Sequence, residues 1–492
     1  MKRKKILSLI IAASIASSNL FAIGANAIEL PYIGKVNSNM SSAKDLTDVL
    51  KEWKNFKYKG EGMVISIIDS GIDYRHKDMK LSDPSKAKIK NKNPEGKGKY
   101  FTDKVPYGYN YADKNQNIID TGSMHGMHVS GIVAANGNSD EVSKFEAIQG
   151  IAPEAQLLAM KVFSNDPDYP SCNDEDVVAA ITDSVKLGAD VINMSLGSEA
   201  GFVKMTEPIQ KAVKMAEENG VVVVISAGNS SYSTNPVKVP DVVDTAIVGA
   251  PSTAKEALSV ASFENSKLNQ SALTCKIGDK AKDFAYLVSE ISPINKLKNE
   301  YELVDCNLGT KDDFKNKDVK GKIALIQRGE NTFIEKKLNA QDAGAVAAII
   351  YNKDGEKGYI GMATDPNVTI PSMFITNEDG KALKDSISKG GKIKFDDKKI
   401  RIDNPNKDNM SGFSSWGPAP SLDFKPQITA PGGNILSTVN DNNYKYMSGT
   451  SMAAPHTSGI MALILQRINS LDLKLSPKDK VELVKNLAIN TS

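Results

Sequence analysis

YMSGTSMAAPHTSGIMALILQ, residues 446–466, joins a run of small residues to a run of apolar ones. Residues 449–454 are small and residues 459–465 are almost continuously apolar, which predicts a loop that enters a buried helix. Pro455 is expected in the first turn of this helix, where its missing N–H costs nothing. Ser451 is then expected at the helix N-terminus, where unpaired backbone N–H groups and the positive end of the helix dipole favour an anion.

A serine in such a position is a candidate nucleophile for acyl transfer. A serine hydroxyl is inert on its own, so the chemistry also requires a general base, an acid that orients the base, and donors for an oxyanion. Three further groups are therefore expected elsewhere in the chain.

The length of the chain limits the number of domains, and its net charge limits the kinds of partner to expect. The chain has 492 residues, which is enough for two or three domains. Its 61 basic and 59 acidic residues leave a net charge of +2. This balance gives no reason to expect nucleic acid or an anionic membrane surface as a partner.

The N-terminus has the pattern of a secretory signal peptide. Basic residues 2–5 precede an apolar stretch, and Ala25-Asn26-Ala27 follows as a cleavage site, so residues 1–27 are expected to be removed. A membrane anchor is the alternative, but serines interrupt the apolar stretch and no other long apolar run exists. The mature chain is expected to lack a transmembrane segment and to be secreted or held in the cell envelope.

Alternating strands and helices predict the fold class. The apolar, β-branched runs are typical of strands buried on both faces, and helical patterns separate them. The pattern predicts an α/β fold with a doubly wound parallel sheet, whose working residues follow the carboxyl ends of the strands. The expected strands are 63–68, 157–163, 191–194 and 221–225, and the expected helices are 125–135, 174–187 and 207–219.

The chain divides into domains where this pattern changes. Residues 28–59 are expected to be a short N-terminal or pro segment, with a short helical pattern at 45–53. Residues 265–408 carry strands and helices of their own and predict a second, small α/β domain. This insert separates the first part of the main domain, 60–264, from its second part, 409–492, which is expected to be truncated. Cys275 and Cys306 could pair, but three cysteines define no disulfide framework.

The candidate base and acid come from the histidines and the strand ends. Of the four histidines, His125 opens a predicted helix, whereas His76, His128 and His456 are interpreted as structural. A metal site at His125 and His128 is an alternative, but it lacks the glutamate of a zinc-protease motif. Asp69 alone would be a turn cap. Together Asp69, His125 and Ser451 match one of the known triad orders, with Asn229 as an oxyanion donor.

Four segments that carry these residues resemble the signature segments of the subtilisin family of serine peptidases. They are residues 69–71, 125–131, 226–229 and 449–456. Within that family the chain looks most like the lactocepin-type cell-envelope proteinases and the related complement-cleaving surface peptidases. The stretches that carry this likeness are residues 105–113, 150–163 and 424–433. Met127 stands where the broad family usually has threonine, which the lactocepin-like branch tolerates.

The resemblance implies a serine endopeptidase that hydrolyses peptide bonds of proteins through an acyl-enzyme, with no cofactor required for the chemistry. It implies that the insert is a protease-associated domain, that Asp78 binds a structural calcium ion, and that missing C-terminal modules attach the protein to the cell wall. Because residues 28–59 are short, little or no pro-domain is expected to be removed. The residues implied to bind the substrate backbone and wall the primary specificity pocket are Ser195, Leu196, Gly197, Ser226, Ala227 and Gly228.

A catalytically silent binding protein or adhesin on a peptidase scaffold is the alternative function. The loss of the aspartate, the histidine, the serine or the asparagine would favour it, and all four are present.

Overall fold

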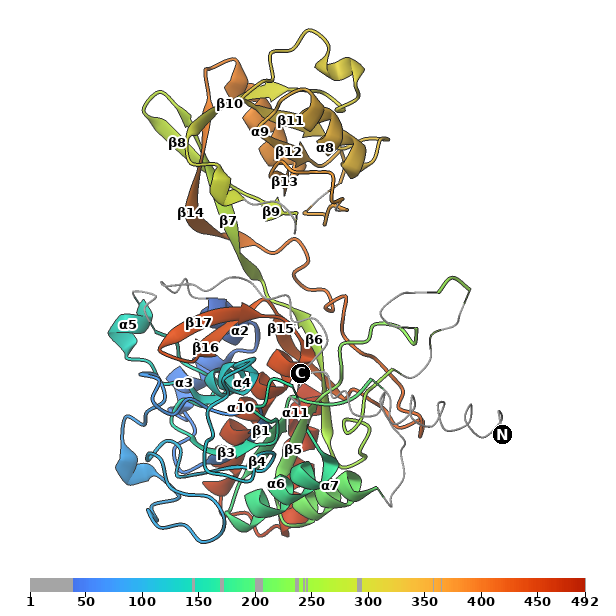
Figure 1. Cartoon of the computed structure of the whole chain (residues 1–492). Coiled ribbons are helices and arrows are strands. Elements are labelled where there is room, and N and C mark those ends of the chain that lie inside the picture. Colours follow the sequence, from blue (N-terminus) through green and yellow to red (C-terminus); the bar gives the residue numbers. More distant parts are fainter. Residues whose placement is uncertain are drawn as a thin grey trace. The chain divides into compact units, whose positions relative to one another are not determined.

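The computed structural model forms two compact units, which are described separately (Figure 1). The first comprises the chain up to Ser266 and from Asp408 onward, and the second comprises Lys267–Lys407. The predicted signal peptide lies outside the described residues. These are residues 39–491 except 144–146, 169–171, 200–206, 235–238, 242–243, 245–246, 290–293, 357 and 364.

The first unit is built on a sheet of seven parallel strands in the order β15-β6-β5-β4-β1-β3-β2. Non-consecutive neighbours in this order require crossover connections, so the predicted doubly wound parallel sheet is confirmed. The strands are β1 (Val64–Asp69), β2 (Tyr107–Asn110), β3 (Gln156–Lys161), β4 (Val191–Met194), β5 (Val222–Ser226), β6 (Leu258–Glu264) and β15 (Ile428–Gly433).

Helices cover both faces of this sheet, and each face has its own core. Along β1, Ile65 and Ile67 join one core and Val64 and Ile68 join the other, because successive strand residues point to opposite faces. α6 (Asp174–Lys186) and α7 (Pro208–Glu218) pack on the face of Val64. The opposite face packs against α4 (His125–Ala134), α10 (Thr450–Asn469) and α11 (Pro477–Thr491).

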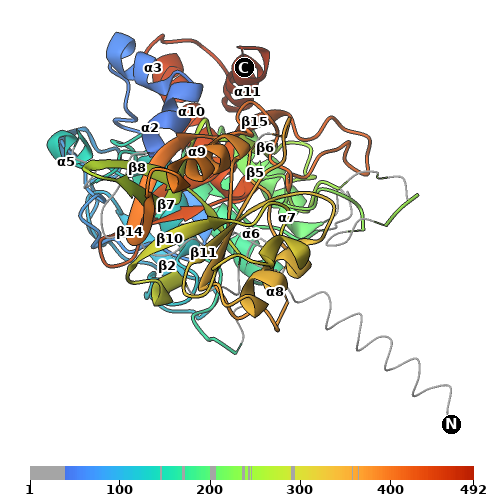
Figure 2. The same ribbon diagram turned by 90° about the horizontal axis from the view of Figure 1, so that it is seen from above.

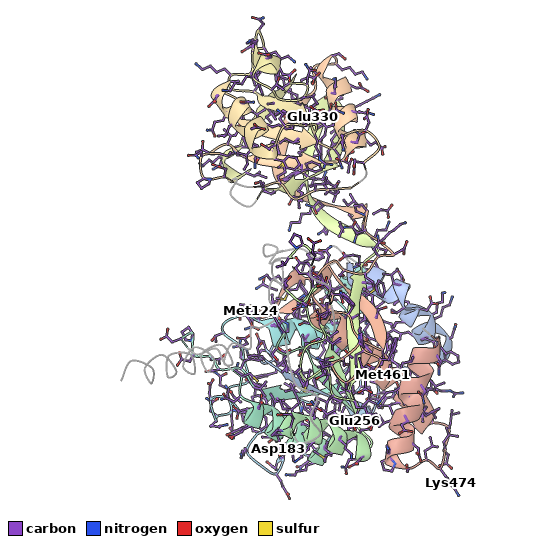
Figure 3. The ribbon with its side chains drawn as sticks, turned by 90° about the vertical axis from the view of Figure 1, so that its right-hand side faces the viewer. Met124, Asp183, Glu256, Glu330, Met461 and Lys474 are labelled. Carbon is purple, nitrogen blue, oxygen red and sulfur yellow. The ribbon has the colours of Figure 1, made fainter. Side chains whose placement is uncertain are left out.

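Shorter elements complete the first unit. The helices α2 (Asn39–Leu46) and α3 (Val49–Phe56) lie on the same side as α10 and α11 (Figure 2). A hairpin packs against α4; its strands are β16 (Ile435–Val439) and β17 (Asn443–Met447). The remaining short elements are η1 (Pro84–Lys86) and α5 (Ser139–Ser143). In Figure 3 Met461 of α10 lies inside the unit and Lys474 at its periphery.

The structure corrects two predicted helix boundaries. α10 begins at Thr450, so Pro455 lies inside the helix and not in its first turn. The predicted helix at 45–53 is two helices, because Asp48 adopts a left-handed conformation with φ of 54° between α2 and α3. The predicted strand at 63–68 and helix at 125–135 agree with β1 and α4 to within one residue at each end.

Three strands of the sheet, β2, β6 and β15, are absent from the sequence prediction. β15 contains Pro431, Gly432 and Gly433, which are depleted from strands. The strand forms because β15 lies at the edge of the sheet, where a proline is tolerated.

The second unit has an eight-stranded mixed sheet in the order β8-β7-β14-β10-β11-β12-β13-β9. Its core strands β10, β11, β12 and β13 run parallel, with α8 on one face and α9 on the other. Its identity as a protease-associated domain stays a prediction. The strands are β7 (Lys267–Ile277), β8 (Lys280–Ala285), β9 (Leu287–Val288), β10 (Glu300–Asp305), β11 (Ile323–Gln327), β12 (Ala347–Tyr351), β13 (Ser372–Ile375) and β14 (Lys392–Asp403). The helices are α8 (Phe333–Asp342), α9 (Asn377–Ile387), η2 (Ile294–Lys296) and η3 (Asp312–Phe314).

All three cysteines are buried free thiols. Cys275 belongs to the core on the α9 face of the second sheet, and Cys306 belongs to the core on the α8 face. The two therefore lie on opposite sides of one sheet, which answers the open question of their pairing. Within the described part of the chain, no helix is both long and apolar enough to cross a membrane.

The double-sided core predicts which substitutions destabilise the first unit. Ile181 of α6 is fully buried, whereas Leu473 after α10 is 47% exposed. We expect Ile181→Ala to cost about 2–5 kcal/mol, since it removes buried groups and leaves a cavity, and Leu473→Ala to cost far less. Thermal unfolding of both variants measures the difference. Equal melting temperatures would contradict the assignment of Ile181 to the core.

Candidate active site

The parallel strands bring the predicted site residues to one edge of the sheet. Asp69 is the last residue of β1, and Asn229 follows the end of β5 by three residues. His125 is the first residue of α4, and Ser451 lies in the first turn of α10. The carboxyl ends of strands and the N-termini of the following helices meet at this edge, so the fold collects residues far apart in sequence.

Asp69 and His125 form a close, buried pair. His125 Nδ1 is 2.8 Å from Asp69 Oδ1, which also accepts the backbone N–H of Ser70 at 2.7 Å. The approach of α4 to β1 depends on Gly126, because a Cβ there would lie 2.6 Å from the backbone N of Gly71. A larger residue at position 126 would push the imidazole away from the carboxylate.

The environment of His125 favours its protonated form. Burial lowers the pKa of His125, but the charge and the hydrogen bond of Asp69, together with the charge of Asp120, outweigh burial and raise it above the ordinary 6.5. A raised pKa makes the neutral ring a stronger base, which suits proton abstraction from a serine.

Thr450, the residue before Ser451, links Asn229 to the start of α10. Asn229 Oδ1 accepts both the backbone N–H and the hydroxyl of Thr450, each at 2.9 Å. The Asn229 amide nitrogen therefore does not face Thr450. It lies beside Gly449, 3.4 Å from the position that a Cβ on that residue would occupy. The Ser451 hydroxyl donates to the Ser195 carbonyl oxygen at 3.4 Å.

Pro455 has a consequence for the residue one turn before it. A residue at this position would normally donate its N–H to the carbonyl of Ser451, and proline has none. The Ser195 hydroxyl instead donates to that carbonyl at 2.9 Å. Ser195 thus contacts Ser451 twice, through its hydroxyl and through its own carbonyl.

A buried polar chain continues from Ser195 into the core. Asn193 Nδ2 donates to the Ser195 hydroxyl at 3.1 Å, and Ser458 of α10 donates to Asn193 Oδ1 at 2.9 Å. All these side chains are buried. The chain ties the end of β4 to α10 beneath the candidate nucleophile, and sequence reasoning did not identify Asn193 or Ser458.

The segments expected to bind the substrate backbone border on Ser451. Ser195, Leu196 and Gly197 follow β4, and the Gly228 N–H donates to the Thr450 hydroxyl at 3.2 Å. The backbone of Ala227 is already paired, with Val260 and with Gly249. Pairing of these segments with substrate stays a prediction, as does the pocket that they are expected to wall with Ser226.

The groups around Asp78 do not fit the expected calcium ion. Asp78 Oδ2 accepts the Tyr444 hydroxyl at 2.8 Å and the backbone N–H of Ile148 at 3.1 Å, and both are donors that compete with a metal. Its Oδ1 is buried without a partner. Calcium takes six to eight oxygen ligands, and the described residues contain no cluster of three acidic, histidine or cysteine side chains suited to a metal.

The other three histidines have structural partners, which confirms their interpretation from sequence. His76 and His128 bond backbone carbonyls of β17, and His456 Nε2 lies 2.8 Å from the Thr47 hydroxyl. Burial lowers the pKa of His128 and of His456 to about 3. Neither ring carries a charge near neutral pH.

Sequence reasoning did not single out two charged residues that lie near His125. Lys161 ends β3 in register with Asp69, is fully buried, and donates to the Ser70 carbonyl. Asp120 lies five residues before His125 in a polar loop. A lysine that ends an apolar strand was a usable signal for Lys161, whereas an aspartate in a polar loop is too common to single out.

Comparison with known proteins places the chain in a family. Residues 60–492 match the subtilase family, a family of serine-type peptidases, and the chain belongs to it. The fold class and the resemblance expected from the sequence are thereby confirmed.

Individual proteins of this family can be compared with the chain. The chain is 40% identical over 466 residues to the PII-type proteinase of Lacticaseibacillus paracasei, covering 87% of this chain and 24% of that protein. It is 42% identical to the PIII-type proteinase of Lactococcus lactis subsp. cremoris, strain SK11, covering 87% and 23%. It is 36% identical to the C5a peptidase of Streptococcus pyogenes serotype M3, covering 92% and 39%. The chain thus spans about a quarter to two fifths of the length of these relatives.

The double contact of Ser195 predicts an energetic coupling with Pro455. Ser195→Ala leaves the buried Ser451 carbonyl without its donor, at a cost of about 1–3 kcal/mol. In a Pro455→Ala background position 455 has an N–H that can reach this carbonyl, so we expect Ser195→Ala to cost less there. A double-mutant cycle of unfolding free energies measures this coupling. Equal costs in both backgrounds would show that Pro455 does not free the carbonyl.

The pKa of His125 predicts a dependence of stability on pH. Its pKa is raised in the folded state, so its protonation stabilises the fold fully below the unfolded value of 6.5 and this contribution is lost as pH rises through the folded value. In Asp69→Asn the effect of burial dominates, and we expect the pKa of His125 to fall below 6.5. NMR titration of the ring measures the shift. Asp69→Asn should also destabilise more at about pH 5 than at about pH 9.

Proposed function

We propose that the chain is a serine endopeptidase, in which Ser451 is the nucleophile, His125 the general base and Asp69 the group that orients the base. The observation that carries this proposal is the 2.8 Å contact between His125 Nδ1 and Asp69 Oδ1, with Ser451 in the first turn of the buried helix α10. Membership of the subtilase family supports the same assignment.

The proposed reaction begins when the Ser451 hydroxyl turns from the Ser195 carbonyl toward His125 Nε2. His125 takes the hydroxyl proton while the oxygen attacks the peptide carbonyl carbon, and Asp69 holds the ring tautomer and stabilises the imidazolium. The oxyanion accepts hydrogen bonds from the Asn229 amide and the Ser451 backbone N–H. His125 then protonates the leaving amine, which gives an acyl-enzyme that water hydrolyses by the reverse sequence. These steps use side chains, the Ser451 backbone N–H and water.

The substrates of the proposed enzyme are proteins or peptides. One relative is named a C5a peptidase and others are named proteinases, which supports a polypeptide substrate for this chain. We propose that the protein acts outside the cytoplasm, secreted or in the cell envelope, in keeping with its predicted signal peptide. Attachment to the cell wall is part of this proposal.

Labelling with a fluorophosphonate probe tests the nucleophile. We expect the wild type to be labelled and Ser451→Ala to be unlabelled, because the probe reacts only with an activated serine. Ser470→Ala, at the opposite end of α10, is the matched control and should be labelled like the wild type. A folded wild type that resists labelling would argue for the binding or adhesin alternative.

Substitution of Asn229 tests the oxyanion site. Asn229→Ala should lower kcat on a peptide substrate by about 10²–10³-fold with little change in KM, a magnitude known from subtilisin, the type member of this family. Steady-state kinetics at one pH measure the effect. A loss confined to KM would assign Asn229 to substrate binding instead.

A further inference from the structure

The loop that leads into α4 contains a buried carboxylate that the proposed reaction does not use. We propose that Asp120 is a positioning residue for His125: its carboxylate gathers the loop between them and fixes where the imidazole enters the site. This inference rests on the proposed function, because it concerns the base of the same reaction.

Asp120 forms hydrogen bonds with most residues of the loop between itself and His125. Its Oδ1 accepts the Gly122 N–H at 2.8 Å, and its Oδ2 accepts the Met124 N–H at 2.7 Å and the Ser123 hydroxyl at 2.8 Å. Ser123 Oγ in turn accepts the His125 N–H at 3.2 Å. Only 4% of Asp120 is exposed, so these donors replace the water that a carboxylate needs.

The backbone of this loop requires such a clamp. Met124 precedes α4 in a left-handed conformation with φ of 58°, and its side chain makes no capping hydrogen bond. A non-glycine residue in this conformation is strained and persists only where its surroundings enforce it. The hydrogen bond from the Met124 N–H to Asp120 supplies that constraint directly before the imidazole.

Ser70 links Asp120 to the other carboxylate of the site. Burial would raise the pKa of Asp120, and the Ser70 side chain is among the groups that lower it instead. The Ser70 hydroxyl accepts the Gly126 N–H at 2.8 Å, while the Ser70 N–H donates to Asp69. One residue therefore connects both carboxylates to the start of α4. A displaced Asp120 would disturb both sides of His125.

Asp120 also acts on His125 through its charge. The charged or titratable groups around this pair are Asp69 on β1, Lys161 on β3 and His128 one turn along α4. Burial and Asp69 have larger effects on the pKa of His125, and the charge of Asp120 raises it further. Loss of this charge should therefore move the acid limb of the reaction to lower pH.

Fluorophosphonate labelling rates across a pH series test the proposal with three variants. Asp120→Asn removes the charge and replaces one acceptor oxygen by a donor NH2 group, and should slow labelling about ten- to a hundredfold and move the acid limb to lower pH. Ser123→Ala keeps the charge but breaks the link to the His125 N–H, and should slow labelling without moving the limb. Asp113→Asn is the control, since Asp113 also faces Lys161 but bonds to Ser164 and Asn165.

The outcomes separate this inference from the proposed function. A folded Asp120→Asn with the wild-type rate and acid limb overturns the inference, as does an Asp113→Asn variant with the same changes as Asp120→Asn. If Asp120→Asn does not fold, Ser123→Ala decides: slowed labelling supports the inference and unchanged labelling overturns it. A wild type that is unlabelled at every pH would instead overturn the proposed function.

Discussion

The packing of α10 against both the parallel sheet and α4 is the constraint on which the rest of the first unit depends. This helix contacts β4, β5, β6 and β15, and it also lies against α4. One buried element therefore carries Ser451 at its start and contacts the element that begins with His125. The relative positions of these two side chains follow from the packing of rigid elements, which holds a site more firmly than surface loops do.

The polar groups beneath Ser451 form a set whose members satisfy one another's hydrogen bonds. Pro455 frees a carbonyl that Ser195 occupies, and Asn193 and Ser458 satisfy the groups behind it. Because an unpaired buried polar group is costly, each member of such a set restricts what its neighbours can become. The region beneath Ser451 therefore behaves as one unit of structure, although its residues come from β4 and α10.

Sequence reasoning reached the fold class and most elements because buried parallel strands are continuous apolar runs. It failed where tertiary contacts decide the local structure. Pro455 was placed at a helix start by its usual preference, whereas the Ser195 hydroxyl makes the helix interior tolerable. Strand β15 was missed because its proline and glycines hide an edge strand. The grouping of Asp69, His125, Ser451 and Asn229 followed from strand ends and resemblance, but Asp120 needed coordinates, since its role lies in contacts with its own loop.

The three cysteines have a practical meaning for a chain that carries a predicted export signal. Burial raises the pKa of Cys172 and raises the pKa of Cys306 to about 12, so these sulfurs stay as thiols near neutral pH. A thiol is far less reactive than a thiolate toward oxidants and alkylating reagents. Because all three thiols are buried, the native fold exposes no sulfur to such reagents.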